Sequence, residues 1–228
     1  HQGRFHAGQM MEFGTHVVAG VSPGKGGSKV GAVPVYDSVK EAVDASGAVA
    51  SVIFVPDSRC LDAAIEAMDS EVRTLVVITE HLPLHDTMVM KRYAELKRCH
   101  LLGPNCPGLS EPGQIKLGIM PNTIFTPGEV AVVSRSGTLT YEVVQHLTEN
   151  GIGQSICIGV GGDPVNGTSL KDALLELAKD DATKGVVMIG EIGGTAEQEA
   201  AKIITGHLDM PMVAYIAGRT APPGKRMG

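Results

Sequence analysis

Apolar runs alternate with amphipathic segments along the first half of the chain. Unbroken runs rich in Val, Ile and Leu cover residues 50–56 and 74–80, and segments with helical spacing of apolar positions follow at 57–70 and 85–98. A continuous apolar run indicates a strand buried on both faces, and its alternation with helices indicates a parallel sheet covered on both sides. The pattern therefore predicts a doubly wound α/β fold.

A second series of the same kind follows a segment rich in proline and glycine at 103–128. Strands are predicted to begin near residues 129, 155, 185 and 211, with a helix after each of the first three. We therefore predict two α/β domains, at 1–104 and 128–228, joined by a linker loop at 105–127.

Each series also lacks an element that a doubly wound unit normally has. The first begins with a helix, although a doubly wound unit normally begins with a strand and a glycine-rich turn. The last strand of the second series has no helix after it. We expect a chain truncated at both ends, without the first strand of the first domain and the C-terminal part of the second.

Composition narrows the class of partner. The 228 residues include 19 Lys and Arg against 25 Asp and Glu, a formal net charge of −6, which argues against a nucleic-acid partner. Hydrophobic residues make up 43%, enough for a folded core, yet no apolar run approaches the roughly 20 residues of a membrane span. Four cysteines without a CxxC pair or zinc spacing favour a reducing compartment and no metal site.

Ligands of doubly wound sheets bind beyond the carboxyl ends of the strands, so the strand-to-helix turns are the most informative segments. Lys25 stands among glycines in SPGKGG, where an NAD site would place Asp or Glu, and its charge suits a phosphate. A solvated loop lysine is the alternative. Ile78, Thr79 and Glu80 close a later strand and are candidates to hydrogen-bond a ligand, although Glu80 could instead cap a helix.

The loop GPNCPG places a thiol, that of Cys106, at the centre of a rigid turn. A reactive position near a ligand is one interpretation. The alternative is a buried small hydrophobe, which is the more common role of a free cysteine.

The second domain carries a run of hydroxyls where a helix is predicted to begin. Ser134, Ser136 and Thr138 surround Gly137 there, and the free N–H groups and dipole of a helix N-terminus attract an anion. The run is neither a Walker A loop nor a nucleophile elbow. A simple N-cap would explain one hydroxyl but not the series.

Glu191 lies between glycines at the end of a later strand, in GEIGG. A carboxylate at such a tip can orient an imidazole, as carboxylates do for catalytic histidines. The alternative is a cap for the helix predicted to begin near Thr195. The spacing places no histidine of the chain convincingly as its partner.

Seven motifs together resemble the alpha subunit of succinate–CoA ligase, in order and over essentially the whole chain. They are SPGKGG, VITE, GPNCPG, VVSRSGTLTYE, GVGGDP, IGEIGG and YIAGRTAPPGKRMG. The resemblance implies a Rossmann-like CoA-binding domain followed by a flavodoxin-like parallel α/β domain. In the family the last motif runs into the histidine that becomes phosphorylated, which would lie just after Gly228.

The resemblance also implies roles for individual residues. The positions matched to coenzyme A are His1 and Gln2 at the phosphate turn, Lys25 facing the CoA phosphates, Ile78, Thr79 and Glu80 at the adenine–ribose edge, and, in the linker, Cys106 near the thiol. In the second domain, Tyr141 is matched to the acyl substrate and Glu191 to the carboxylate that steadies the phosphohistidine. The turn at 134–138 is matched to the helix start that faces the phosphate.

The activity implied by the resemblance is the reversible formation of succinyl-CoA from succinate and CoA, coupled to ATP or GTP. It passes through succinyl phosphate and a phosphohistidine. The nucleotide, with Mg²⁺, would bind a separate beta subunit in a heterodimer or heterotetramer. The location would be cytoplasmic or the mitochondrial matrix, with the cytoplasm preferred.

Two alternatives stay open. The alpha subunit of malate–CoA ligase and related acyl-CoA ligases share these motifs, although Pro107 and Thr140 favour the succinate branch. A non-catalytic regulator that binds CoA or a dinucleotide is the other alternative. Lys25 argues against NAD, and the hydroxyl turn together with Glu191 argues against a simple binding module.

Overall fold

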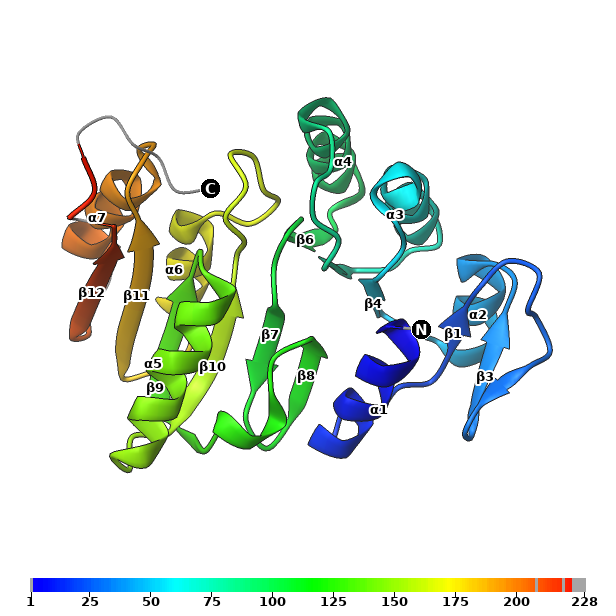
Figure 1. Ribbon diagram of the computed structural model, residues 1–228, viewed down its shortest axis with the longest axis horizontal. Helices are drawn as coiled ribbons and strands as arrows, with labels where there is room; N and C mark the ends of the chain where they lie inside the picture. The colour runs from blue at the N-terminus through cyan, green and yellow to red at the C-terminus, as the bar shows by residue number, and fades with distance from the viewer. Residues whose placement is uncertain (1, 208, 219, 223–228) are drawn as a thin grey trace.

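Alternating strands and helices build two α/β units, which lie beside each other in the computed structural model (Figure 1). The structure describes residues 2–207, 209–218 and 220–222. In Figure 1 the first unit lies on the right, in blue to green, and the second on the left, in green to red.

The first unit contains two three-stranded sheets. Its elements are α1 (Gln2–Phe13), β1 (Gly20–Val21), β2 (Lys29–Val30), β3 (Val33–Tyr36), α2 (Val39–Ser46), β4 (Ala50–Ile53), η1 (Asp57–Arg59), α3 (Cys60–Asp69), β5 (Thr74–Val77), α4 (Leu84–Lys97) and β6 (His100–Leu102). The strand orders are β1-β3-β2 and β4-β5-β6, and the second of these sheets is parallel.

Local sequence explains why these elements begin and end where they do. Leu75, Val76 and Val77 are fully buried, as expected for the central strand β5 with both faces covered. Ser38 caps α2 by accepting a hydrogen bond from the backbone N–H of Glu41, at 3.2 Å. The helix ends at Gly47, whose φ of +68° suits glycine.

The second unit is one six-stranded sheet with helices. Its elements are β7 (Gly108–Glu111), β8 (Ile115–Gly118), η2 (Asn122–Ile124), β9 (Pro127–Ser134), α5 (Gly137–Glu149), β10 (Gln154–Gly159), α6 (Leu170–Leu177), β11 (Gly185–Glu191), α7 (Ala196–His207) and β12 (Met212–Ala217). The strand order is β12-β11-β9-β10-β7-β8.

Strand order within the parallel part of this sheet identifies where a ligand should bind. Read as β10-β9-β11-β12, the four parallel strands have the order 2-1-3-4, which is flavodoxin-like, so the predicted α/β class is confirmed. The chain changes direction across the sheet between β9 and β11. Ligands of open α/β sheets bind at that switch point, beyond the carboxyl ends of the strands.

The sequence predicts a linker loop over residues 105–127, but the structure has a hairpin there, formed by β7 and β8. Strand β7 pairs antiparallel with β10 and so joins the second sheet. Gly108 and Gly118 face each other in the hairpin, and a Cβ at Gly108 would lie 1.9 Å from the carbonyl oxygen of Leu117. These glycines allow close backbone approach between strands, whereas composition alone suggested turns.

A shared core fixes the two units against each other. One hydrophobic cluster includes Val76 and Leu102 of the first unit, Cys106 of the loop that follows it, and Val133 and Leu174 of the second unit. The helix α1 also contacts the hairpin, where Thr15 Oγ1 donates to the backbone oxygen of Lys116 at 2.7 Å. The strand tips of both units therefore belong to one packed body.

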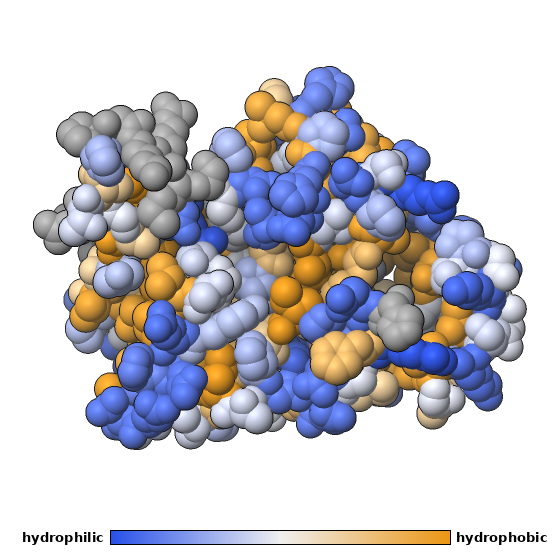
Figure 2. Space-filling model, viewed as in Figure 1, coloured by the Kyte–Doolittle hydropathy of each residue, from blue (hydrophilic) through white to orange (hydrophobic). Residues whose placement is uncertain are grey.

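On the face that Figure 2 presents, hydrophobic residues gather in the middle, with hydrophilic residues above and below them. Within the described ranges, no helix is long and apolar enough to cross a membrane.

Candidate functional site

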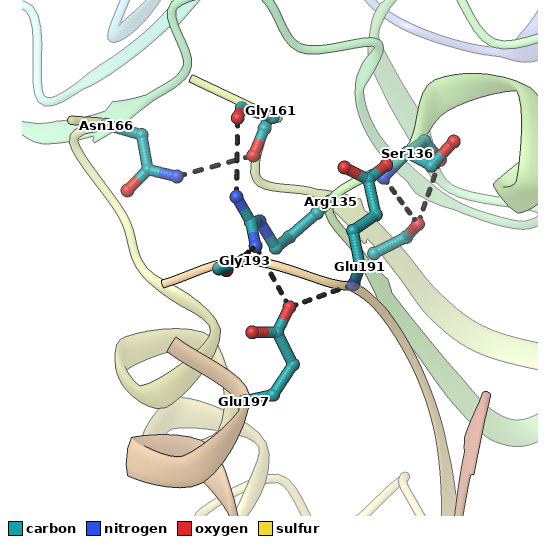
Figure 3. A network of polar contacts seen from close by, with 9 residues as sticks. Arg135, Ser136, Gly161, Asn166, Glu191, Gly193 and Glu197 are labelled. Carbon is teal, nitrogen blue, oxygen red and sulfur yellow. Dashed lines mark hydrogen bonds and ion pairs between the residues drawn. The ribbon is translucent and has the colours of Figure 1, made fainter. Parts of the chain in front are cut away.

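The switch point brings together the hydroxyl turn and the acidic strand tip. Ser134, at the end of β9, is paired with Ile189 of β11, and the Arg135 backbone N–H donates to the Ile189 oxygen at 3.1 Å. Glu191 ends β11 two residues later. Figure 3 shows this group with the start of α5 at one side.

The start of α5 is shaped to leave donors available. The Ser136 hydroxyl caps the helix by accepting from the Leu139 N–H at 3.4 Å. The N–H groups of Gly137 and Thr138 have no partner within the helix, because the first turn of an α-helix lacks acceptors for them. Thr138 is exposed, so its hydroxyl also faces solvent at this end. The helix dipole adds positive potential at the same place.

Ser134 supports the turn from beneath. Its side chain is fully buried, and its hydroxyl donates to the Ser136 oxygen at 2.8 Å and accepts from the Ser136 N–H at 3.0 Å. These bonds fix the backbone of the turn. The hydroxyls of Ser136 and Thr138, unlike that of Ser134, lie where a ligand of the helix start would be.

Glu191 has a fixed backbone and an uncommitted side chain. Its N–H donates to Glu197 Oε1 at 2.9 Å, and its carboxylate points away from Glu197 in Figure 3. Among the described residues, no hydrogen bond or ion pair engages this carboxylate. It does not cap α7, where Thr195 Oγ1 instead bonds Glu199 at 2.8 Å.

A largely buried ion pair between Arg135 and Glu197 lies next to the backbone of Glu191, and the sequence did not predict it. Arg135 Nη1 lies 3.0 Å from Glu197 Oε1, and the two side chains are 11% and 13% exposed. Arg135 also donates to the backbone oxygens of Gly193, at 3.5 Å, and Gly162, at 3.4 Å. Arg135 lies in the motif VVSRSGTLTYE, but its partner is 62 residues away, and nothing in the spacing of the motifs indicates that pairing.

The turn that carries Lys25 is rigid and exposed. The N–H of Gly26 donates to Asp37 Oδ1 at 2.8 Å, and a Cβ at Gly26 would lie 2.4 Å from the other oxygen of that carboxylate. Gly24 and Gly27 have φ angles of +77° and +79°, which favour glycine. In the described part of the chain, the Lys25 amine has no hydrogen-bond or ion-pair partner, and Asp37 is a support that the sequence did not reveal.

The tip at Ile78, Thr79 and Glu80 is tied to the neighbouring loop. Thr79 Oγ1 donates to the Val55 oxygen at 2.7 Å, and the Thr79 oxygen accepts from the N–H of Asn105 at 3.0 Å. Ile78 packs against the shared core, whereas Glu80 is exposed near His81.

Of the other residues matched to coenzyme A, the tip is joined to the loop of Cys106 but, among the described residues, by no hydrogen bond or ion pair to Lys25 or Gln2. Lys25 follows a strand of the other sheet, and among the described residues no hydrogen bond or ion pair links it to the tip. Gln2 opens α1 and is exposed, and His1 lies outside the described residues.

Cys106 and Tyr141 are neighbours whose groups stay neutral at neutral pH. Cys106 is buried, with Sγ 3.3 Å from the Val77 oxygen, and burial raises its pKa to about 12. Burial also raises the pKa of Tyr141 to about 12, with a smaller contribution from Cys106. The Cys106 side chain is therefore packed as a small hydrophobe, the second of the two interpretations that the sequence allowed. In the described residues, no group of three or more His, Cys, Asp or Glu could hold a metal ion.

Comparison with known proteins decides the family. A model described as a CoA binding domain matches residues 1–81, and one described as CoA-ligase matches residues 133–228. The succinate–CoA ligase (ADP-forming) subunit alpha of Staphylococcus aureus strain Mu50 is 54% identical over 224 residues, which are 98% of this chain and 74% of that protein. The chain belongs to the succinate–CoA ligase alpha-subunit family. The Staphylococcus epidermidis RP62A protein of the same name is also 54% identical over 224 residues.

Solved structures agree with this family assignment at the level of the fold. ATP citrate lyase from Methanothrix soehngenii, in complex with citrate and coenzyme A, is similar with a TM-score of 0.80 and 25% identity. That match covers 86% of this chain and 34% of the lyase chain. A dinucleotide-forming acetyl-coenzyme A synthetase from Ca. Korarchaeum cryptofilum, with phosphate and ADP, gives a TM-score of 0.79 at 22% identity, over 93% of this chain and 46% of that one.

In this member of the succinate–CoA ligase family, the GVGGDP motif connects the two units. Asn105 Nδ2 donates to Asp163 Oδ1 at 2.8 Å, and the N–H of Gly167 donates to the Gly103 oxygen at 2.8 Å. Gly162 of the same loop accepts from Arg135. A chain of contacts thus runs from the Thr79 tip, through Asn105, to the residues around Glu191.

Proposed function

We propose that this chain is the alpha-subunit portion of a succinate–CoA ligase, which forms succinyl-CoA reversibly from succinate and CoA with ATP or GTP. The observation that carries the proposal is the 54% identity over 98% of the chain to alpha subunits that bear this name. The geometry of the switch point supports it, because a free carboxylate stands beside a helix start with unpaired donors.

Coenzyme A is proposed to bind along the strand tips of the first unit. The Lys25 amine, free on its rigid turn, suits the CoA phosphates as a point charge. The tip at Ile78, Thr79 and Glu80 offers backbone groups and a carboxylate to the adenosine. The hydrogen bond from Asn105 to Thr79 connects this tip to the loop that leads into the second unit, where the thiol of CoA has to reach the acyl group. Tyr141 keeps its phenolic proton at neutral pH, and burial raises its pKa further, to about 12, so it is suited to donate a hydrogen bond to the acyl substrate.

Phosphoryl transfer is proposed to occur between Glu191 and the start of α5. A phosphoryl group on one imidazole nitrogen leaves an N–H on the other, and the Glu191 carboxylate can accept that proton in a hydrogen bond. The N–H groups of Gly137 and Thr138 and the hydroxyls of Ser136 and Thr138 can meet the phosphoryl oxygens, which makes the phosphorylated state less costly.

The reaction then needs two exchanges. A succinate carboxylate oxygen attacks phosphorus, so that a P–O bond forms as the P–N bond breaks and the imidazole is released. The CoA thiolate next attacks the acyl carbon, a C–S bond forms, and inorganic phosphate leaves with the electrons of the C–O bond. The imidazole leaves as a neutral ring, whereas the phosphate released in the second exchange is an anion that the helix dipole at the start of α5 can stabilise.

The nucleotide and its Mg²⁺ are proposed to be supplied by a beta subunit, in a heterodimer or heterotetramer. A cytoplasmic location is proposed with it.

An assay with the cognate beta subunit tests the function. The full-length protein that contains this chain is purified with its beta subunit, and CoA thioester formation is measured with succinate, malate or citrate and with ATP or GTP. Succinate should give the highest kcat/KM. A preference for malate or citrate would assign the chain to the related acyl-CoA ligases, and CoA binding without thioester formation would favour a regulator.

A further inference from the structure

We propose that Arg135 and Glu197 are positioning residues for the phosphoryl-transfer step and that they act through Glu191. This inference rests on the proposed function, because it assigns Glu191 as the acceptor of the imidazole N–H. The side chains of Arg135 and Glu197 are largely buried, at 11% and 13% exposed, and both are engaged in contacts within the protein. These contacts hold the groups that we assign to the reaction.

One carboxylate oxygen of Glu197 holds two elements at once. Oε1 accepts from the Glu191 N–H at 2.9 Å and from Arg135 Nη1 at 3.0 Å, so the backbone of Glu191 and the guanidinium share one acceptor (Figure 3). Glu197 stands in the first turn of α7, where a carboxylate also interacts favourably with the helix dipole. The position of Glu191 is therefore set by α7 as well as by β11.

The guanidinium of Arg135 extends this support to three strand ends. Arg135 directly follows β9, and its guanidinium donates to the backbone oxygens of Gly162, beyond β10, and Gly193, beyond β11. A planar fork with five donors is suited to such divergent acceptors, and a lysine ammonium is not. Arg135 thus ties the loop of the GVGGDP motif and the tip of Glu191 to the turn that begins α5.

The pair also determines the charge around Glu191. Arginine pairs readily with carboxylates in bidentate geometry, and the guanidinium lies on the oxygen that the Glu191 N–H shares. In Glu197→Gln, the Glu191 N–H and the guanidinium would share an amide oxygen in place of a carboxylate oxygen, so both contacts would weaken and Glu191 would be held less firmly.

The sequence makes room for this arrangement at Gly190. A Cβ on Gly190 would lie 2.5 Å from Glu197 Cγ and 2.8 Å from its Oε1. Residue 190 therefore has to be glycine for Glu197 to reach both the Glu191 N–H and Arg135.

A double-mutant cycle on the phosphoenzyme tests the proposal. The variants Glu191→Gln, Glu197→Gln and the double variant are prepared in the full-length protein with its beta subunit, and phosphoenzyme formation from ATP or GTP is followed. Glu197→Gln should lower the rate by about tenfold or more, since misplacement by an ångström costs about 100-fold. It should add little in the Glu191→Gln background, because it acts through that residue. CoA affinity should not change.

A matched control is Glu199→Gln, since Glu199 lies in the same first turn of α7 and bonds Thr195. It should leave the rate within about twofold of the unmodified protein. If Glu197→Gln does not fold, Arg135→Lys keeps the buried charge and is put through the same cycle. A normal rate in Glu197→Gln, or a loss that multiplies fully with that of Glu191→Gln, overturns the inference while leaving the proposed function intact. A normal rate in Glu191→Gln overturns the assigned role of Glu191 itself.

Discussion

Lys25 stands on an exposed glycine turn, and no described residue pairs with its amine, whereas the tips of β9 and β11 are joined by a largely buried ion pair and several backbone contacts. Both sets of turns follow strands of α/β units, and both carry charge. In the first unit the charged group is presented to solvent. In the second unit, Arg135 and Glu197 form an ion pair with each other, and no described residue pairs with the Glu191 carboxylate.

This difference is suited to two kinds of task. A long, flexible ligand such as a CoA can be held by several separate contacts, each of modest strength, and a free lysine needs little preorganisation for that. A phosphoryl group on imidazole has to meet fixed donors and a fixed carboxylate, so error in position is costly. The tightly supported unit is therefore the one to which we assign the chemistry.

Gly190→Ala should have the largest effect on this contrast. The added methyl group collides with Glu197, so we expect a loss of about 3 kcal/mol in the free energy of unfolding and a fall of at least about tenfold in phosphoenzyme formation. Chemical denaturation and the phosphorylation rate measure the two effects. Gly185→Ala is the control on the same strand, because its Cβ would lie 3.5 Å from the nearest atom, an ordinary contact. Equal effects in the two variants would contradict the account.

Lys25→Ala should have a smaller effect, limited to binding. Loss of a charge-assisted contact should weaken CoA binding by about 1.5 kcal/mol, or roughly tenfold in Kd, with stability unchanged. Isothermal titration calorimetry checks the affinity. Lys29→Ala, a nearby exposed lysine on β2, should bind CoA normally. An unaltered Kd in Lys25→Ala would remove this residue from the CoA site.

The smallest predicted effect concerns Cys106. Its pKa is raised from 9.0 to about 12 in the folded protein, so the thiol ionises first in the unfolded state as pH rises. Its contribution to stability is complete below about pH 9 and declines between 9 and 12. Raising the pH from 7 to 9 should therefore lower the free energy of unfolding by about half a kcal/mol through this thiol.

Comparing urea denaturation of the unmodified protein and Cys106→Ala at the two pH values isolates that contribution. The variant should lose about half a kcal/mol less over the interval. An identical pH dependence in both proteins would mean that Cys106 is less buried than the structure has it.

Periodicity and turn chemistry were enough to predict the α/β class, two units and the positions of most helices. Buried runs such as that of β5 and caps such as Ser38 depend on neighbouring residues, which a sequence displays directly. The motifs also indicated that Ser136 and Glu191 belong to one site, and the switch point does bring their segments together.

Long-range pairing set the limit of that approach. The hairpin at 105–127 has mixed polarity, with Ser110 and Lys116 buried, so it lacks the alternation that predicts strands. Glu197 was missed because its meaning depends on Arg135, and the partnership is visible only once β9 and β11 are adjacent. Cys106 had two interpretations that sequence could not separate, since burial decides between them.

The lifetime of the phosphoenzyme in Glu191→Gln tests the central claim most directly. The full-length protein with its beta subunit is phosphorylated, nucleotide is removed, and the acid-labile phosphoryl group is followed over time, with Glu149→Gln at the exposed end of α5 as the control. We predict that Glu191→Gln shortens the lifetime or lowers the yield by about 100-fold, the scale of losing one preorganised contact to a reacting group. A lifetime and yield equal to those of the unmodified protein would contradict the assignment of Glu191.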